Sequence, residues 1–278
     1  MKKTKLLGWF LMGLTTITSC TNDAEDMLAP EIKLTSEIMP SRVTSLDYQS
    51  TRIVEGQQIG VTITGAKSEH NNIAWTAGAN GALHNENSPV YWGETDITVT
   101  SYHPYNADFN GTSYVFSVHT DQSTNAGYLN SDLLWATKTA SVTEEPIALA
   151  FTHQLAKINV TLTSEDIADL SNASIFICGT NIATGFNPAT GELSAATSHI
   201  AEIKASVTTD KAYTGSAIIV PQWVKKGTPF IKIKINNKDL HYTLPEDMEY
   251  KSGHSYNYSL QVKDSNMENP IEGEESEW

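Results

Sequence analysis

The sequence predicts an all-β protein built from two consecutive β-sandwich domains. Apolar residues recur at every second position in many short segments, which is the pattern of half-buried strands. Turn-forming pairs such as Asn110-Gly111 and Asn236-Asn237 separate these segments. Helical periodicity is weak, and the best helix candidate, residues 164–170 with Ser164 as N-cap, is short. Many short strands joined by such turns are typical of β-sandwiches.

The strand candidates follow one another along the chain. The first covers residues 31–39, where Ile32, Leu34 and Ile38 share one face. Pro40 ends this strand, because proline cannot donate to a sheet ladder. Later candidates are residues 59–63, 97–99, 114–119, 147–151, 158–162, 174–178, 217–220, 230–235 and 255–262.

A domain boundary is predicted at residues 141–146, a polar, turn-prone segment that ends in Pro146. It separates residues 43–145 from residues 146–263, and each block is long enough for about seven strands. The remaining residues 264–278 show no regular alternation and are expected to form an acidic C-terminal tail. Its crowded glutamates are Glu268, Glu272, Glu274, Glu275 and Glu277.

Residues 1–20 resemble a bacterial lipoprotein signal peptide. Lysines come first, then an apolar run at residues 6–17 that is too short to span a membrane, and then Ser19-Cys20. The resemblance implies that Cys20 carries palmitate or a related lipid and tethers the precursor to the outer membrane, exposed at the cell surface. The alternative is an ordinary signal peptide with a chance cysteine.

The composition excludes several classes of function. Hydrophobic residues make up 40% of the chain and aromatic residues 9%, so a packed core is expected. The formal net charge of -14 argues against binding to nucleic acid or to anionic lipid headgroups. No other apolar run approaches the roughly 18 residues that a transmembrane helix needs.

No catalytic motif or cofactor site stands out. The sequence has no G-x-S-x-G, H-E-x-x-H or C-x-x-C element, and its eight histidines lack metal-ligand spacing. We therefore expect neither a metal site nor an enzyme, although a glycosidase with two carboxylates is a weaker alternative. Cys178 has apolar neighbours and is expected to be buried. Core packing, rather than glycan binding, is expected for Trp75, Trp92, Trp135 and Trp223.

The chain has only two arginines, Arg42 and Arg52, and both lie near the N-terminus. An arginine-specific protease would therefore have only these two sites. Cleavage after Arg42 would separate the first strand from the rest of the chain. Two residues alone do not exclude a chance placement.

Several segments together resemble the fimbrillin family, the subunits of type V pili. The most specific is the F-x-H-x-L-A-K element, in which Phe151 and Leu155 are expected in the core and His153 as a structural polar contact. Gln57 and Ser101 stand where the family often has Asp and Ala. The matching segments are GQQIGV (56–61), PVYW (89–92), SYHPY (101–105), DLLWA (132–136), LAFTHQLAKI (149–158) and GHSYNY (253–258).

The resemblance implies two transthyretin-like Greek-key β-sandwich domains and a role as a structural or adhesive pilus subunit. It implies a propeptide at residues 21–42 that an arginine-specific protease removes after Arg42, with Arg52 as the alternative site in the following strand. The removable strand would carry Ile32, Leu34 and Ile38, and a strand of another pilus subunit would replace it.

Two questions stay open at this stage. A surface glycan-binding lipoprotein that does not polymerise is the alternative function, and a host or bacterial surface ligand would serve either role. The sequence does not distinguish a stalk, tip or anchor subunit. The tail after Lys263 is a poor donor strand by its pattern, which slightly favours a tip or accessory role.

Overall fold

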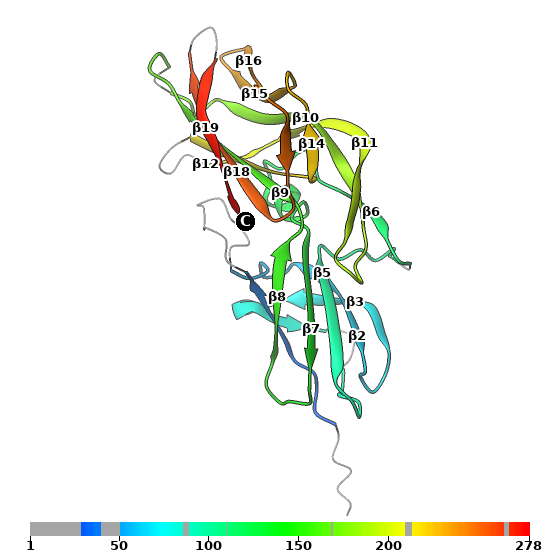
Figure 1. The fold of residues 1–278 in the computed structure, drawn as a ribbon. Coiled ribbons are helices and arrows are strands. Elements are labelled where there is room, and N and C mark those ends of the chain that lie inside the picture. Colours follow the sequence, from blue (N-terminus) through cyan, green and yellow to red (C-terminus); the bar gives the residue numbers. More distant parts are fainter. Residues whose placement is uncertain are drawn as a thin grey trace, which may run out of the picture.

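The computed structural model describes residues 29–39, 51–85, 89–109, 111–167, 169–208, 213–263 and 267–278. Strands account for most of these residues, so the prediction of an all-β protein is confirmed. Figure 1 shows two bodies, joined where strands β7 and β8 of the lower body meet β9 of the upper one.

The lower body is a closed sheet, here called the N-terminal barrel. Its described strands, in spatial order, are β1 (Leu34–Ile38), β4 (Ala82–His84), β3 (His70–Ala77), β2 (Gln58–Thr64), β5 (Ile97–His103), β7 (Leu134–Ala140) and β8 (Ile147–His153). Strand β1 closes the barrel by pairing with β4 on one side and with β8 on the other. The sequence predicted a β-sandwich here, and the parallel pairing of β1 with β8 closes the sheet into a barrel.

The upper body consists of sheets that share one apolar core. Within the described residues, the first sheet contains β11 (Leu193–Lys204), β10 (Ser174–Phe186), β15 (Pro229–Ile235), β16 (Lys238–Thr243) and β6 (Tyr114–Ser117). The second contains β12 (Ser206–Thr208), β13 (Tyr213–Ile219), β9 (Ala156–Thr163), β18 (His254–Val262) and β19 (Met267–Glu277). A small additional sheet pairs β14 (Gln222–Val224) with β17 (Met248–Tyr250).

Alternation explains both cores. In β2, Ile59, Val61 and Ile63 are buried in the barrel, while Thr62 and Thr64 lie on the other face. In β10 and β15, Ile175 and Ile233 are cross-strand partners, and both are completely buried. The barrel and the upper body therefore have separate apolar clusters.

The division between the two bodies does not follow the boundary predicted from the sequence. Strand β6 precedes the barrel strand β7 in sequence, yet it pairs with β10 of the upper body. Strand β8 was expected to begin the second domain at residue 146, but it pairs with β1 and β7 of the barrel. The specific F-x-H-x-L-A-K element thus crosses the junction: Phe151 lies in the barrel core and Leu155 in the upper core. We propose a domain boundary between β8 and β9.

The last residues are also different from the expectation of an acidic tail without a strand. Strand β19 pairs antiparallel with β18, from the pair Val262 and Met267 to the pair His254 and Glu277. Backbone pairing rather than apolar alternation forms this edge strand. The final residue, Trp278, is only 7% exposed, and its backbone N–H donates to the Gly253 carbonyl at 2.7 Å.

The predicted helix at residues 164–170 is wrong for its described part, which contains no helical turn. The Ser164 hydroxyl accepts a hydrogen bond from the Ile167 N–H at 2.9 Å, so the capping contact forms without a helix behind it. A short helix occurs elsewhere, as α1 (Asn125–Leu129), with the Thr124 side chain accepting from the Gly127 N–H. Its five residues are too few for a periodic signal.

Candidate functional site

Strand β1 and the segments beside it form the candidate functional site. Ile32, Leu34 and Ile38 are 2%, 2% and 4% exposed, whereas Lys33 and Glu37 face solvent. The inward orientation that the alternation predicts for these three aliphatic side chains is therefore present. Whether the strand can be removed stays a prediction.

Strand β1 is hydrogen-bonded along both of its edges. On one side, Leu34 to Ile38 pair with Ile147 to Phe151 of β8. On the other side, the strand meets β4 and, at its start, the Ile32 N–H donates to the Val90 carbonyl at 2.7 Å. Loss of β1 would leave two edges unpaired and an apolar trough between them.

A small polar contact lies at the middle of the strand. Ser36 is buried, and its hydroxyl donates to the Gly81 carbonyl at 3.3 Å and accepts from the Ile53 N–H at 3.4 Å. Gly81 has a φ of +79°, and a Cβ at this position would lie 2.8 Å from the Ser36 carbonyl oxygen. A glycine is required here because both the backbone angle and the close approach exclude a side chain.

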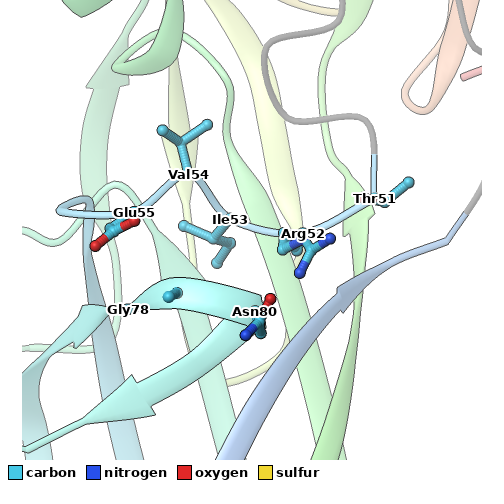
Figure 2. Close-up of a pocket in the computed structure, with 8 residues that line it drawn as sticks. Thr51, Arg52, Ile53, Val54, Glu55, Gly78 and Asn80 are labelled. Carbon is cyan, nitrogen blue, oxygen red and sulfur yellow. The ribbon is translucent and has the colours of Figure 1, made fainter.

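Arg52 lies in a bend before β2, not in a strand as expected. Figure 2 shows Arg52 beside Asn80, with Ile53 and Val54 pointing to opposite sides of the segment. The Arg52 side chain is exposed, but Ile53 is completely buried, and the Thr51 carbonyl accepts from the Ile38 N–H at 2.9 Å. The backbone on both sides of Arg52 is therefore tied to β1.

The hollow in Figure 2 has a volume of about 420 Å³ and is lined by residues 51–55 and 78–80. Arg52 and Glu55 place both signs of charge at its rim. Two further predicted residues, the lipidation site Cys20 and the processing site Arg42, lie outside the described residues.

A polar cluster lies where the two bodies meet. His153 Nδ1 lies 2.8 Å from the Asp132 carboxylate, and the His153 ring stacks on Trp278 with centroids 3.8 Å apart. The Lys157 ammonium lies 5.6 Å from the Trp278 ring centroid. His103 Nδ1 donates to the Asp132 carbonyl, and burial lowers the pKa of His103 below its usual value. His153 thus makes the structural polar contact that the sequence suggested, and the end of the chain packs against it.

Core packing was expected for four tryptophans and burial for Cys178, and one of the tryptophans differs. Trp75 and Trp92 are 3% and 1% exposed, and Trp135 is half-buried. Trp223 contradicts the expectation of core packing, since it is 60% exposed on the small β14–β17 sheet. Cys178 is buried, and burial raises the pKa of its thiol to about 11, so the thiol is protonated at neutral pH.

Two features are absent from the part of the chain that the structure describes. None of its helices is long and apolar enough to cross a membrane. Its His, Cys, Asp and Glu side chains form no group of three or more that could hold a metal ion.

The closed N-terminal barrel and the upper body of several sheets define an all-β protein with two apolar cores. The fimbrillin-like family profile matches residues 41–278, which is most of the chain, and the chain belongs to that family. The resemblance to the fimbrillin family is thereby confirmed. A search of curated proteins gives no match.

Solved structures share the fold. A candidate cell adhesion protein from Bacteroides ovatus has a TM-score of 0.70 at 19% identity, covering 90% of this chain and 98% of that one. A candidate cell adhesion protein from Bacteroides uniformis has a TM-score of 0.67 at 19% identity, with coverage of 89% and 98%. The C-terminally truncated tip fimbrial protein Mfa3 from Porphyromonas gingivalis has a TM-score of 0.52 at 10% identity, with coverage of 90% and 100%.

Proposed function

We propose that this protein is a pilus subunit that is exported as a lipoprotein, processed after Arg42 and assembled by strand exchange. Membership of the fimbrillin-like family supports the coarser part of this statement, a surface pilus or adhesion subunit. The observation that carries the finer part is the position of β1, which closes the barrel with both edges paired and its apolar side chains buried.

Processing after Arg42 is favoured over processing after Arg52 by the surroundings of Arg52. A protease needs several consecutive residues in an accessible, extended conformation, and buried backbone resists cleavage. Ile53, which would follow the cut at Arg52, is completely buried and hydrogen-bonded to Ser36. Cleavage after Arg42 would instead leave the segment that begins at Thr51 in place beside the vacated edge.

Release of β1 changes the barrel in two ways. It exposes the apolar surface that Ile32, Leu34 and Ile38 cover, at a cost of about 1.5–3 kcal/mol for each side chain. It also frees the backbone groups of β8 that pair with β1. An incoming strand with the same alternation would restore both sets of contacts by β-augmentation.

The other parts of the proposal concern location. Lipid on Cys20 would hold the precursor at the outer membrane, and the mature subunit would reside in a surface fimbrium. Solved structures of similar fold are described as cell adhesion or fimbrial proteins, which agrees with a structural or adhesive role rather than an enzymatic one.

Two arginine variants test the processing step. Arg42→Ala should remain a stable monomer, whereas Arg52→Ala should assemble like the unmodified protein. Electron microscopy and a laddering gel after treatment with an arginine-specific protease give the readout. Normal fibres from Arg42→Ala would refute cleavage after this residue, and normal fibres from the double variant would refute arginine-triggered assembly altogether.

Lipidation has its own test. Cys20→Ala should abolish labelling with a palmitate analogue in the expressing cell, because the thiol is the acceptor of the lipid. Persistent labelling of this variant would show that the signal peptide resemblance is misleading.

A further inference from the structure

The outer face of the barrel carries two rows of threonines in register. Strands β2, β5 and β7 lie side by side, and each contributes the pattern Thr-x-Thr. Cross-strand pairing aligns Thr62 with Thr100 and Thr137 in one row, and Thr64 with Thr98 and Thr139 in the other. The intervening residues of β2 and β5, such as Ile63 and Val99, face the core, so the threonines present their hydroxyl and methyl groups outward.

Sheet stability explains part of this pattern. The hydroxyls of Thr98 and Thr139 lie 3.0 Å apart, and those of Thr100 and Thr137 lie 3.4 Å apart. Cross-strand threonine pairs of this kind stabilise a sheet by themselves. They do not explain why three of these threonines line a groove that has one aromatic wall.

That groove lies between the barrel and the upper body and has a volume of about 610 Å³. Thr62, Thr64 and Thr100 form part of its lining together with the side chains of Tyr102 and Phe109. The turn between β10 and β11 contributes Pro188 and Ala189 from the upper body. The volume falls within the range of sites for small molecules, and such sites favour boundaries between domains.

The groove is held in shape by specific contacts. The Tyr102 ring lies over Gly60, where a Cβ would come within 2.3 Å of the ring. The Tyr102 hydroxyl donates to Asn72 Oδ1 at 2.7 Å, and Asn72 Nδ2 donates to the Phe109 carbonyl at 3.1 Å. These bonds fix the aromatic wall against the barrel.

A second set of contacts fixes the opposite wall. The Trp135 indole N–H donates to the Pro188 carbonyl at 2.9 Å. Gly191 lies directly against the Trp135 ring, where a Cβ would approach within 2.6 Å. The β10–β11 turn is thus docked on the barrel, which fixes this wall of the groove.

The chemistry of the lining selects the ligand. None of the described residues that line this groove is charged, although the chain has a net charge of -14. The hollow at Arg52 and the hollow beside Trp223 both contain charged side chains, among them Glu55 and Glu249. A charged ligand would lose its hydration in the threonine groove without gaining a partner of opposite charge.

We propose that this groove and the adjoining threonine rows bind a neutral carbohydrate chain. Threonine hydroxyls and the Asn71 amide can hydrogen-bond sugar hydroxyls, and the half-buried Phe109 ring offers an apolar surface to the C–H face of a sugar ring. The binding does not require release of β1, so it is independent of the proposed processing.

The test is affinity electrophoresis of the Arg42→Ala protein through gels that contain dextran, mannan or laminarin, with anionic polygalacturonate as the comparison polymer. We expect retardation by at least one neutral polymer and none by polygalacturonate. The double variant Thr64→Val/Thr100→Val should weaken that retardation at least tenfold. The hydroxyls of Thr64 and Thr100 make only long hydrogen bonds, of 3.5 and 3.4 Å. Because valine also suits a strand, the variant should keep the fold.

Matched controls separate this site from other surfaces. Thr243→Val changes an exposed strand threonine of the upper body, and Trp223→Ala removes the exposed indole. Both should bind like the parent, while Phe109→Ala should lose binding and stay folded. The proposal is overturned if no neutral polymer retards the protein, if the threonine variant binds normally, or if Trp223→Ala alone abolishes binding.

Discussion

The first and the last described strands of this chain are attached in different ways. Strand β1 fills the gap between β4 and β8 and so closes the barrel; this position is called the seam below. It is hydrogen-bonded to both strands, and its inward side chains are buried. Strand β19 lies at the open edge of a sheet and pairs only with β18 among the described strands. Its attachment is completed by Trp278, which packs against His153 and Lys157.

The two attachments differ in what the loss of a strand does to the structure. Loss of β1 opens a barrel and exposes an apolar trough, whereas loss of β19 shortens a sheet and exposes one new edge. A strand at the seam is therefore suited to act as a removable plug, that is, a strand that fills the gap between two others and can be replaced by another strand. A strand at an edge needs a local anchor, and the terminal tryptophan provides one.

The largest expected effect comes from a charge in the seam. Leu34→Asp places an unpaired carboxylate where the side chain is 2% exposed, so the free energy of unfolding should fall by more than about 4 kcal/mol. Urea denaturation followed by tryptophan fluorescence measures the change. Lys33→Asp, on the outer face of the same segment, is the control and should change stability by less than about 0.5 kcal/mol. Equal effects of the two variants would contradict the buried seam.

The anchor of the last strand gives the second prediction. Trp278→Ala should cost about 3 kcal/mol, because it removes a buried indole and its stacking on His153. Hydrogen exchange should become faster in residues 267–277 and stay unchanged in β1. The control Trp223→Ala removes an exposed indole and should leave both strands protected. Faster exchange in β1 would mean that the two terminal strands are coupled.

A glycine beside the seam gives a smaller effect. Gly81→Ala combines a positive φ with a contact of 2.8 Å to the Ser36 carbonyl, whereas Gly227→Ala has a φ of +83° and no atom within 4 Å. The backbone strain of about 1–2 kcal/mol is common to both. Gly81→Ala should therefore be less stable than Gly227→Ala by about 2 kcal/mol, the cost of overpacking. Equal melting temperatures would show that the contact with β1 has no energetic weight.

The smallest expected effect concerns the junction of the two bodies. Because burial lowers the pKa of His103, the unfolded chain binds a proton near pH 6.5 that the folded chain does not. Stability should therefore decrease as the pH falls below about 6.5, until the folded pKa is reached. Titration of the His103 ring by NMR should give a midpoint below 6.5, the ordinary value for histidine. A midpoint at or above 6.5 would rule out this contribution.

Local patterns predicted much of this structure, because alternation depends only on neighbouring residues. The strand containing Leu34 and the burial of Phe151 could be inferred in this way. The turn at Asn236-Asn237 was also predictable, and both residues adopt positive φ angles between β15 and β16.

Long-range pairing could not be inferred from these patterns. The parallel alignment of β1 with β8 joins residues more than a hundred positions apart, and β6 pairs outside its own half of the chain. Strand β19 has little apolar alternation, so its pairing with β18 left no signal in the sequence. Trp223 lies beside a strand pattern, but only the position of the β14–β17 sheet decides that it is exposed.

The most direct measurement is the exchange of the first strand. The Cys20→Ala precursor is cut with an arginine-specific protease and incubated with a large excess of a fluorescent peptide that copies residues 29–39. Strand exchange predicts that the cut protein takes up one peptide per barrel, with Ile32, Leu34 and Ile38 reoccupying the seam, while uncut Arg42→Ala takes up none. Absence of uptake by the cut protein, or equal uptake by the uncut variant, would contradict the proposal that β1 is a removable plug.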